Sequence, residues 1–312
     1  MTGERAGRIV SIGECMVEMA PAGDGHFAMG FAGDTLNTAW YLRRALPPDW
    51  EVDYLSAVGR DAISERMLAF FRDAGIGCAH VARVEGRTVG LYLIELRDGE
   101  RSFAYWRETS AARLLATDAA RLDAALAGAR AACLSGITLA ILPGEDRARL
   151  MAALARARTS GTLVVFDPNL RPRLWPDRRA MCDAVSAMAA ASDLVLPSHD
   201  DEAAAFGDAD PETTARRYLA LGPRLVVVKN GAGAMVIAGS GLAGGAAPGE
   251  TGLARWQPPP VAGIVDTTAA GDSFNAAFLA AHLRGAGYPD ALAAGAALAG
   301  RVIGRRGALV EV

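Results

Sequence analysis

The sequence lacks the residue patterns that usually hold a structural metal or a disulfide framework. Its 312 residues include only four cysteines, at positions 15, 78, 133 and 182, and no two of them form a CxxC pair. The four histidines are scattered as well, and no HExxH motif is present. A zinc centre is therefore not expected, and reduced thiols in a cytoplasmic protein are predicted.

A strong excess of one charge and long apolar runs are also missing. Lys and Arg total 32 and Asp and Glu total 35, which gives a formal net charge of −3. This balance argues against nucleic-acid and membrane partners, so a negatively charged ligand must be bound by local groups. No apolar run is long enough to span a bilayer, and the N-terminal residues do not have the pattern of a secretory signal.

The sequence does contain short apolar segments that alternate with helical patterns, as in α/β proteins with a parallel sheet. Predicted strands cover 8–13, 52–58, 131–135, 163–166, 194–196 and 225–228. Predicted helices in the first third cover 35–44 and 63–74. Polar or small residues that follow strands are expected at the ligand-binding edge of such a sheet. They are Gly136, Asp167, Asn169, Ser198, Lys229 and Gly231.

A second, smaller sheet is predicted outside this main body. Residues 88–96 and 101–107 alternate between apolar and polar side chains, and Asp98-Gly99 joins them, which indicates a β-hairpin. The segment 16–31 is expected to extend this sheet. Residues 239–260 are rich in Gly and Pro and are predicted to form loops or an irregular hairpin.

The most informative segment runs from Val265 to Phe274, where small residues lead into a helical pattern that ends at Gly285. Small side chains let a polyphosphate approach the backbone, and the start of the helix offers free N–H groups. Asp272 in the first turn can accept a proton from an attacking hydroxyl. The alternative is an acid that only favours the helix dipole. The pattern indicates phosphoryl transfer from a nucleotide to an alcohol.

Two other polar elements have both a functional and a structural interpretation. Asp34 and Asn37 lie on one face of a first helical turn, where they can bind sugar hydroxyls or cap the helix. Residues 229–233, Lys-Asn-Gly-Ala-Gly, follow a strand and can lie along a nucleotide or form a plain turn. The 229–233 loop does not have the GxGxxG pattern of the dinucleotide fingerprint, which argues against an NAD-dependent oxidoreductase.

Taken together, these motifs resemble the PfkB (ribokinase-like) carbohydrate kinases over essentially the whole chain. Within the family the sequence is most similar to members that act on 2-keto-3-deoxygluconate. The segments that carry this similarity are 13–18 (GECMVE), 33–39 (GDTLNTA), 105–107 (YWR), 167–171 (DPNLR) and 266–278 (DTTAAGDSFNAAF), the last with Ala269 where many relatives have glycine.

The resemblance implies one kinase domain over residues 1–312, with a ribokinase-like, Rossmann-type three-layer α/β/α body. Residues of about 14–32 and 87–108 would form a small β-sheet lid. The implied reaction is transfer of phosphate from ATP, with Mg²⁺, to the terminal C6 hydroxyl of 2-keto-3-deoxygluconate, which gives 2-keto-3-deoxy-6-phosphogluconate. Other open readings are a kinase of fructose, ribose or an epimeric ketodeoxy sugar acid, and a non-catalytic sugar-acid sensor.

The resemblance also implies residue roles. Asp272 would be the general base, and the N–H groups of Ala269, Ala270, Gly271 and Asp272 would form an anion hole. Sugar-acid ligands would be Gly33, Asp34, Asn37, Tyr92, Tyr105, Arg107 and Arg171. ATP would lie near Asn169, Ser198, Lys229, Gly231, Gly233 and Gly271. A monovalent-cation loop, for K⁺, would involve Asp266, Thr268, Val302 and Gly307.

Two departures from the family pattern bear on these roles. The family's Asn-x-x-Glu element, linked to magnesium, is Ser198-His199-Asp200-Asp201 here, so Asp201 keeps a carboxylate with a shorter reach. Ser64 replaces a common glycine and is expected to affect only local packing. Arg107 and Arg171 match a carboxylate with their planar fork, although each can instead pair with a structural acid. A homo-oligomer is expected, because small open sheets often pair.

Overall fold

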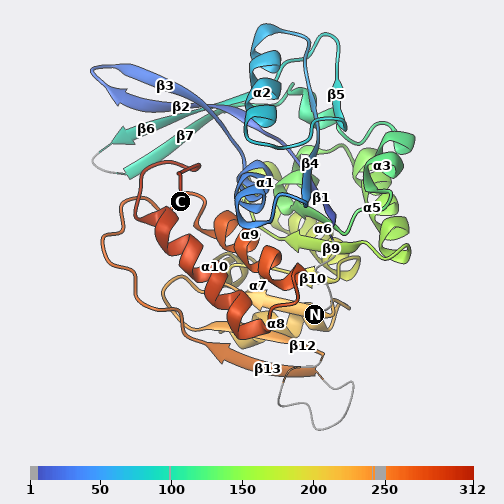
Figure 1. Cartoon of the computed structure of the whole chain (residues 1–312), viewed down its shortest axis with the longest axis vertical. Helices are drawn as coiled ribbons and strands as arrows, with labels where there is room; N and C mark the ends of the chain where they lie inside the picture. Colours follow the sequence, from blue (N-terminus) through green and yellow to red (C-terminus); the bar gives the residue numbers. More distant parts are fainter. Residues whose placement is uncertain (1–5, 98–99, 241, 243–250) are drawn as a thin grey trace.

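The computed structural model describes residues 6–97, 100–240, 242 and 251–312 (Figure 1). Its main body is built on a nine-stranded sheet, in which neighbouring strands pair in parallel except for two antiparallel pairings at one edge. The strand order is β13 (Thr251–Trp256), β12 (Met235–Ser240), β11 (Leu225–Val228), β10 (Leu194–Val195), β9 (Leu163–Asp167), β8 (Ala131–Ser135), β1 (Arg8–Ile12), β4 (Glu51–Val58) and β5 (Val81–Arg83).

Helices cover both faces of this sheet. Alternate side chains of each strand point to opposite faces, so they pack into two separate hydrophobic cores. On β1, Ile9 belongs to one core, whereas Val10 and Ile12 belong to the other. The first core packs against α1 (Asp34–Ala45), α2 (Ala62–Asp73), α9 (Ala270–Leu283) and α10 (Tyr288–Ile303). The second packs against α3 (Ala119–Leu126), α4 (Gly136–Ile141), α5 (Gly144–Thr159), α6 (Arg178–Ala190), α7 (His199–Phe206), α8 (Pro211–Leu219) and the 3₁₀ turns at 111–114 and 172–174.

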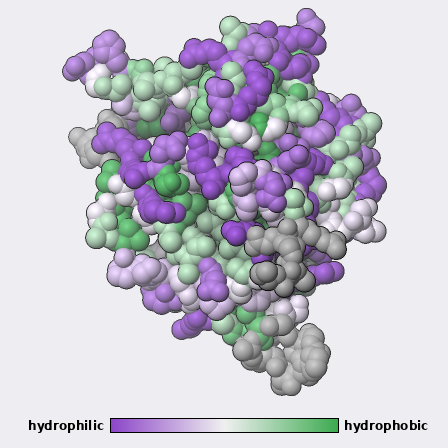
Figure 2. Space-filling model, in the orientation of Figure 1, coloured by the Kyte–Doolittle hydropathy of each residue, from purple (hydrophilic) through white to green (hydrophobic). Residues whose placement is uncertain are grey.

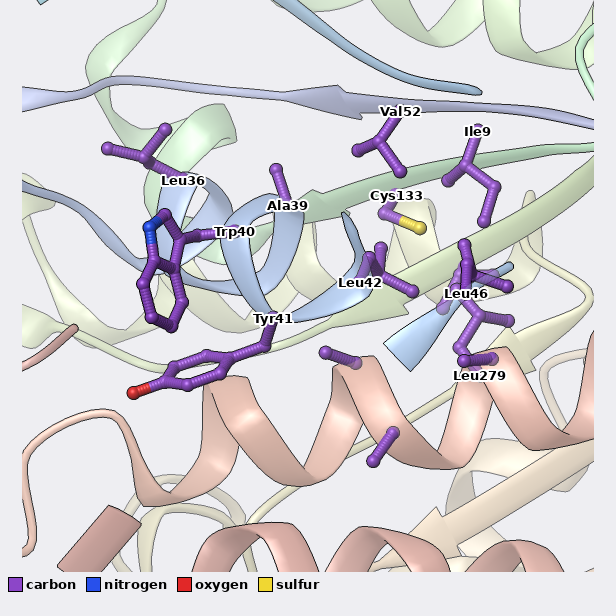
Figure 3. Close-up of a cluster of buried hydrophobic side chains, with 14 of the residues drawn as sticks. Ile9, Leu36, Ala39, Trp40, Tyr41, Leu42, Leu46, Val52, Cys133 and Leu279 are labelled. Carbon is purple, nitrogen blue, oxygen red and sulfur yellow. The ribbon is translucent and has the colours of Figure 1, made fainter. Parts of the chain in front are cut away.

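The predicted three-layer α/β/α body is therefore confirmed. Figure 3 shows part of the first core, where Trp40, Tyr41 and Leu42 of α1 lie among strand residues and Leu279 of α9. None of the described helices is both long and apolar enough to cross a membrane. On the face drawn in Figure 2, hydrophilic and apolar residues are interspersed.

The second sheet has four strands in the order β3 (His26–Ala32), β2 (Met16–Gly23), β6 (Gly90–Arg97) and β7 (Glu100–Trp106). It projects from one side of the body, near the C-terminus (Figure 1). The two predicted strands of the hairpin are antiparallel neighbours, and the Asp98-Gly99 turn between them lies outside the described residues. Strands β2 and β6 pair in parallel and join the two hairpins.

One region had two alternative predictions, and two elements were not predicted from the sequence. Strands β12 and β13 form an antiparallel hairpin, so of the two predictions for 239–260 the hairpin is confirmed, and 241 and 243–250 lie outside the described residues. Strand β5 and helix α10 were not predicted from the sequence. Ser64, by contrast, acts locally as expected: its buried hydroxyl accepts from Gly59 N at 2.9 Å and donates to Asp61 at 3.0 Å.

Candidate active site

The first turn of α9 presents main-chain N–H groups at the edge of the large sheet. Ala269 caps the helix in a left-handed conformation, with φ 60°, and the Ala270 N–H donates to the Thr267 carbonyl at 3.2 Å. The N–H groups of Gly271 and Asp272 have no acceptor within the described part of the chain. These two amides, at the positive end of the helix, can bind an anion.

The carboxylate of Asp272 lies against the first turn of α1, where two of the predicted sugar ligands begin that helix. Asn37 Nδ2 donates to Asp272 Oδ2 at 2.8 Å, and Asp34 accepts from Asn169 Nδ2 at 2.7 Å. Removal of the carboxylate from water raises the pKa of Asp272 to about 8, the Asp34 charge adds to this, and the Asn37 hydrogen bond opposes it. Asp272 is therefore placed to exchange a proton near neutral pH.

Lys229 supplies a positive charge beside this helix start. Its Nζ donates to Asp167 Oδ2 at 3.0 Å and to Asn275 Oδ1 at 3.1 Å, and the residue is buried. A Cβ added to Gly271 would lie 3.5 Å from Lys229 Nζ. The absence of a side chain at Gly271 thus leaves the ammonium group and the free amides adjacent to one another. A phosphate group is the ligand that such a combination suits best.

The segment predicted to line the nucleotide is a turn between two strands. Residues 229–234 connect β11 to the antiparallel β12, and Gly233 N donates to the Asn230 carbonyl at 2.8 Å. Gly231 has φ 52°, a conformation that suits glycine. Ser198, which caps α7, pairs with Lys229 as an isolated parallel bridge. Both interpretations from the sequence are thus compatible with this geometry, since a turn at the sheet edge can also lie along a nucleotide.

On the four-stranded sheet, one face carries a cluster of aromatic side chains. The Tyr92 hydroxyl donates to the Glu18 carboxylate, and its ring lies 6.0 Å from Tyr105 and 6.2 Å from Phe103. Burial, reinforced by the Glu18 charge, raises the pKa of Tyr92. Tyr92 also belongs to an apolar cluster that packs against Ala269. This face is therefore turned toward the start of α9.

Comparison with known proteins agrees with this arrangement. The sequence profile of the pfkB family of carbohydrate kinases matches residues 6–311. The chain belongs to the pfkB family of carbohydrate kinases. It is accordingly a sugar kinase, and the predicted ribokinase-like fold is confirmed.

Several relatives cover nearly the whole chain. The 2-dehydro-3-deoxygluconokinase of Dickeya dadantii is 39% identical over 312 residues, with 97% of both chains covered. The enzyme of the same name from Haemophilus influenzae is 36% identical, with 97% of this chain and 96% of that one covered. Among solved structures, a PfkB protein from Polaromonas sp. JS666 superposes with a TM-score of 0.82 at 30% identity and covers 96% of both chains.

Within this pfkB kinase, Arg107 pairs with a carboxylate of the protein itself. Its guanidinium donates to Glu14 Oε2, and both residues are buried. This is the structural alternative that the sequence left open for the arginines. One carboxylate does not use all five N–H groups of a guanidinium, and Arg107 Nε has no partner among the described residues. Arg107 thus keeps donors for a ligand, and any ligand that it binds meets Glu14 as a neighbour.

Arg171 and Asp201 form a more open pair at the edge of the large sheet. Arg171 Nη1 lies 3.6 Å from Asp201 Oδ2, and their side chains are 50% and 39% exposed. Burial raises the pKa of Asp201, although the nearby Arg171 opposes the shift. An exposed pair at this distance contributes little to stability, so Arg171 is available to an anionic ligand.

The predicted monovalent-cation loop is held together by Asp266. Its Oδ1 accepts from the N–H and hydroxyl of Thr268 at 3.0 and 2.7 Å, and its Oδ2 accepts from Gly307 N at 2.8 Å. The carbonyl of Val302 accepts from Arg305 N at 3.0 Å. Asp266 therefore ties the segment before α9 to the segment after α10. K⁺ binding here stays a prediction, which a comparison of turnover in K⁺ and tetramethylammonium salts can check.

Several residues of the site were not assigned a role from the sequence. Asn275 follows Asp272 by three positions on α9, and this i,i+3 spacing is a signal that could have revealed it. Glu14 and Glu18 stand four apart in the quoted GECMVE segment, but their partners Arg107 and Tyr92 lie 93 and 74 residues away. No local pattern indicates pairs of that separation.

Proposed function

We propose that this kinase transfers the γ-phosphate of ATP to the terminal hydroxyl of 2-dehydro-3-deoxygluconate, which is the 2-keto-3-deoxygluconate named above. The observation that carries the proposal is the position of Asp272, whose carboxylate stands beside the free N–H groups of Gly271 and Asp272 and close to Lys229. The names of relatives that are 36–39% identical over nearly the whole chain support this choice of substrate.

In this mechanism, the sugar hydroxyl attacks the γ-phosphate in line while Asp272 takes its proton. The main-chain N–H groups of Gly271 and Asp272, with Lys229, stabilise the negative charge that develops on the phosphate oxygens. A base with a pKa near the working pH suits this role, because it is partly ionised before the reaction and retains the proton afterwards. The small sheet, acting as a lid, would exclude water and so limit hydrolysis of ATP.

Magnesium fits this site only as an ion held mainly by the nucleotide. The described residues contain no group of three or more His, Cys, Asp or Glu side chains that could hold a metal ion. Mg²⁺ commonly takes one or two protein carboxylates together with phosphate oxygens and water. Asp201 is the carboxylate that we assign to it, and the ion would neutralise charge on the phosphates.

The test is an assay of ADP release over a panel of substrates. We expect release with 2-dehydro-3-deoxygluconate to exceed release with its C4 epimer, fructose and ribose. Preference for a neutral sugar would replace the proposed substrate, and binding of the acid without ADP release would indicate a sensor. Light scattering on the same preparation decides whether the predicted homo-oligomer forms.

A further inference from the structure

The two sheets are joined by four short segments of chain, which together are called the junction. They are residues 13–15 between β1 and β2, Gly33 between β3 and α1, residues 84–89 between β5 and β6, and residues 107–110 after β7. Any change in the position of the small sheet relative to the body must be absorbed in these segments. Contacts among them, together with the packing of Tyr92 against Ala269, therefore set where the small sheet stands.

Glu14 contacts each of the other junction segments or the residue next to it. Its side chain pairs with Arg107 of the fourth segment. A Cβ on Gly33 would collide with the Glu14 carbonyl oxygen, so the backbones of the first and second segments touch. A Cβ on Gly90, the residue after the third segment, would lie 2.9 Å from Glu14 Oε1 and 3.2 Å from Arg107 Cβ. Glycine at 33 and 90 makes this close approach possible.

The remaining segments are also bonded to one another. Ala111 N donates to the Thr88 carbonyl at 2.8 Å, and Arg87 Nη1 donates to the Thr109 carbonyl at 3.1 Å. Within this network Glu14 and Arg107 are the only oppositely charged pair of side chains that the described residues place in the junction. Both are more than nine-tenths buried, at 3% and 8% exposure. An uncompensated charge is costly in such a place, so each holds the other in position.

The pair also retains unused hydrogen-bonding capacity. Glu14 Oε1, Arg107 Nε and Ser110 Oγ are buried, and none has a partner within the described ranges. A buried polar group without a partner is unusual and costs stability. Such groups can serve a ligand or water that completes the network.

We propose that Glu14 is a positioning residue, which holds Arg107 at the junction and thereby sets the position of the small sheet over Asp272. In part this rests on the proposed function, because Arg107 would then meet the carboxylate of the sugar acid. The part that concerns the small sheet rests on the junction alone. Loss of the Glu14 charge should therefore loosen the small sheet in the ligand-free protein as well as weaken binding of the acid.

The test compares Glu14→Gln with Asp53→Asn, which breaks the half-buried Arg8–Asp53 pair of the body, 2.9 Å long. Hydrogen exchange of the ligand-free proteins is measured first. We expect Glu14→Gln to speed exchange in β2, β3, β6 and β7 by about tenfold, the scale of one lost charge-assisted bond, and to leave β8 and β9 unchanged. Equal speeding in both sheets, or none in the small sheet, overturns the proposal.

Kinetics then separate positioning from general stability. In Glu14→Gln, the KM for the sugar acid should rise by about tenfold while the KM for ATP stays within about twofold. In an Arg107→Gln background the same change should add almost nothing, since Glu14 acts through Arg107. Full additivity, or a lower KM for the acid, contradicts the proposal.

The role of Glu14 can still be tested if the variant does not fold or if the sugar acid is not the substrate. Should Glu14→Gln fail to fold, Arg107→Lys keeps the charge without the fork and must loosen the same four strands, or the proposal fails. Should the wild-type protein not phosphorylate the acid, the proposed function fails, whereas the exchange comparison still decides the role of Glu14.

Discussion

The polar groups at the edge of the large sheet and the exposed aromatic residues of the small sheet are held in different ways. At the edge of the nine-stranded sheet, Asp272 and Lys229 each bond to side chains from other elements, so their positions are determined from more than one side. On the four-stranded sheet, Tyr105 and Trp106 are 50% and 60% exposed. We infer a division of labour, in which the large sheet fixes the reacting groups and the small sheet recognises the sugar.

The largest expected effect concerns the reacting group itself. Asp272→Asn keeps the size of the side chain but removes the base, and kcat should fall by roughly two to four orders of magnitude. Because the small sheet is untouched, the KM for the sugar acid should change little. Steady-state kinetics with both substrates give the two constants, and an unchanged kcat would remove Asp272 from its role.

Arg171 tests the proposed division of labour between the two sheets. It follows β9 of the large sheet, yet it is assigned to binding of the sugar acid. A charge-assisted bond of about 1.5–3 kcal/mol corresponds to roughly a ten- to hundredfold change in binding. Arg171→Ala should raise the KM for the acid by that factor and leave the KM for ATP nearly constant. Equal effects on both substrates would place Arg171 with the nucleotide.

The pH dependence of kcat/KM tests the ionisation of Asp272, the reacting group of the large sheet. With the pKa of Asp272 at about 8, kcat/KM should rise about tenfold per pH unit below that value and level off above it. The exposed small-sheet residues should not contribute to this profile. A profile that is flat from about pH 6 to about pH 8 would argue against a protonated Asp272 in the free enzyme.

Stability should respond to the same proton in the opposite direction. The pKa of an aspartate side chain is ordinarily 3.8 and that of Asp272 in the folded protein is about 8, so between these values the folded state holds the extra proton. The free energy of unfolding of the ligand-free protein should therefore fall as pH rises, by at most about 1.4 kcal/mol per unit. Denaturant titrations at several pH values should show a weaker dependence in Asp272→Asn.

The smallest effect is expected on the exposed face of the small sheet. Tyr105→Ala removes a ring that stacks on Phe103 and lies tilted against Tyr92, a contact of about 1 kcal/mol. The KM for the sugar should rise about fivefold, and kcat should stay within about twofold. A loss confined to kcat would break the proposed division between the sheets.

Much of the fold could be predicted because its signals are local. The apolar runs at 163–166 and 225–228 became β9 and β11, and the small residues before Asp272 became the start of α9. Strand β5 has only three residues, too few for a periodic pattern. Strand β12 was not predicted as a strand of its own, because the Gly- and Pro-rich segment 239–260 begins within it.

The site could be predicted only in part, since it is assembled by packing. Asp34, Asn37 and Asp272 were recognised as polar groups at helix starts, but the bond between Asn37 and Asp272 joins residues 235 positions apart. The burial of Arg107 beside Glu14 likewise depends on how the two sheets meet. Sequence motifs indicate which residues matter, whereas the partner of each is decided by tertiary structure.

A crystal structure with a non-hydrolysable ATP analogue and 2-dehydro-3-deoxygluconate would show directly whether Asp272 and the neighbouring amides form the reaction centre. We expect the terminal phosphate on the N–H groups of Gly271 and Asp272, with the sugar's terminal hydroxyl about 3 Å from the Asp272 carboxylate. A carboxylate turned away from the sugar, with those two amides bonded to other protein atoms, would contradict this expectation.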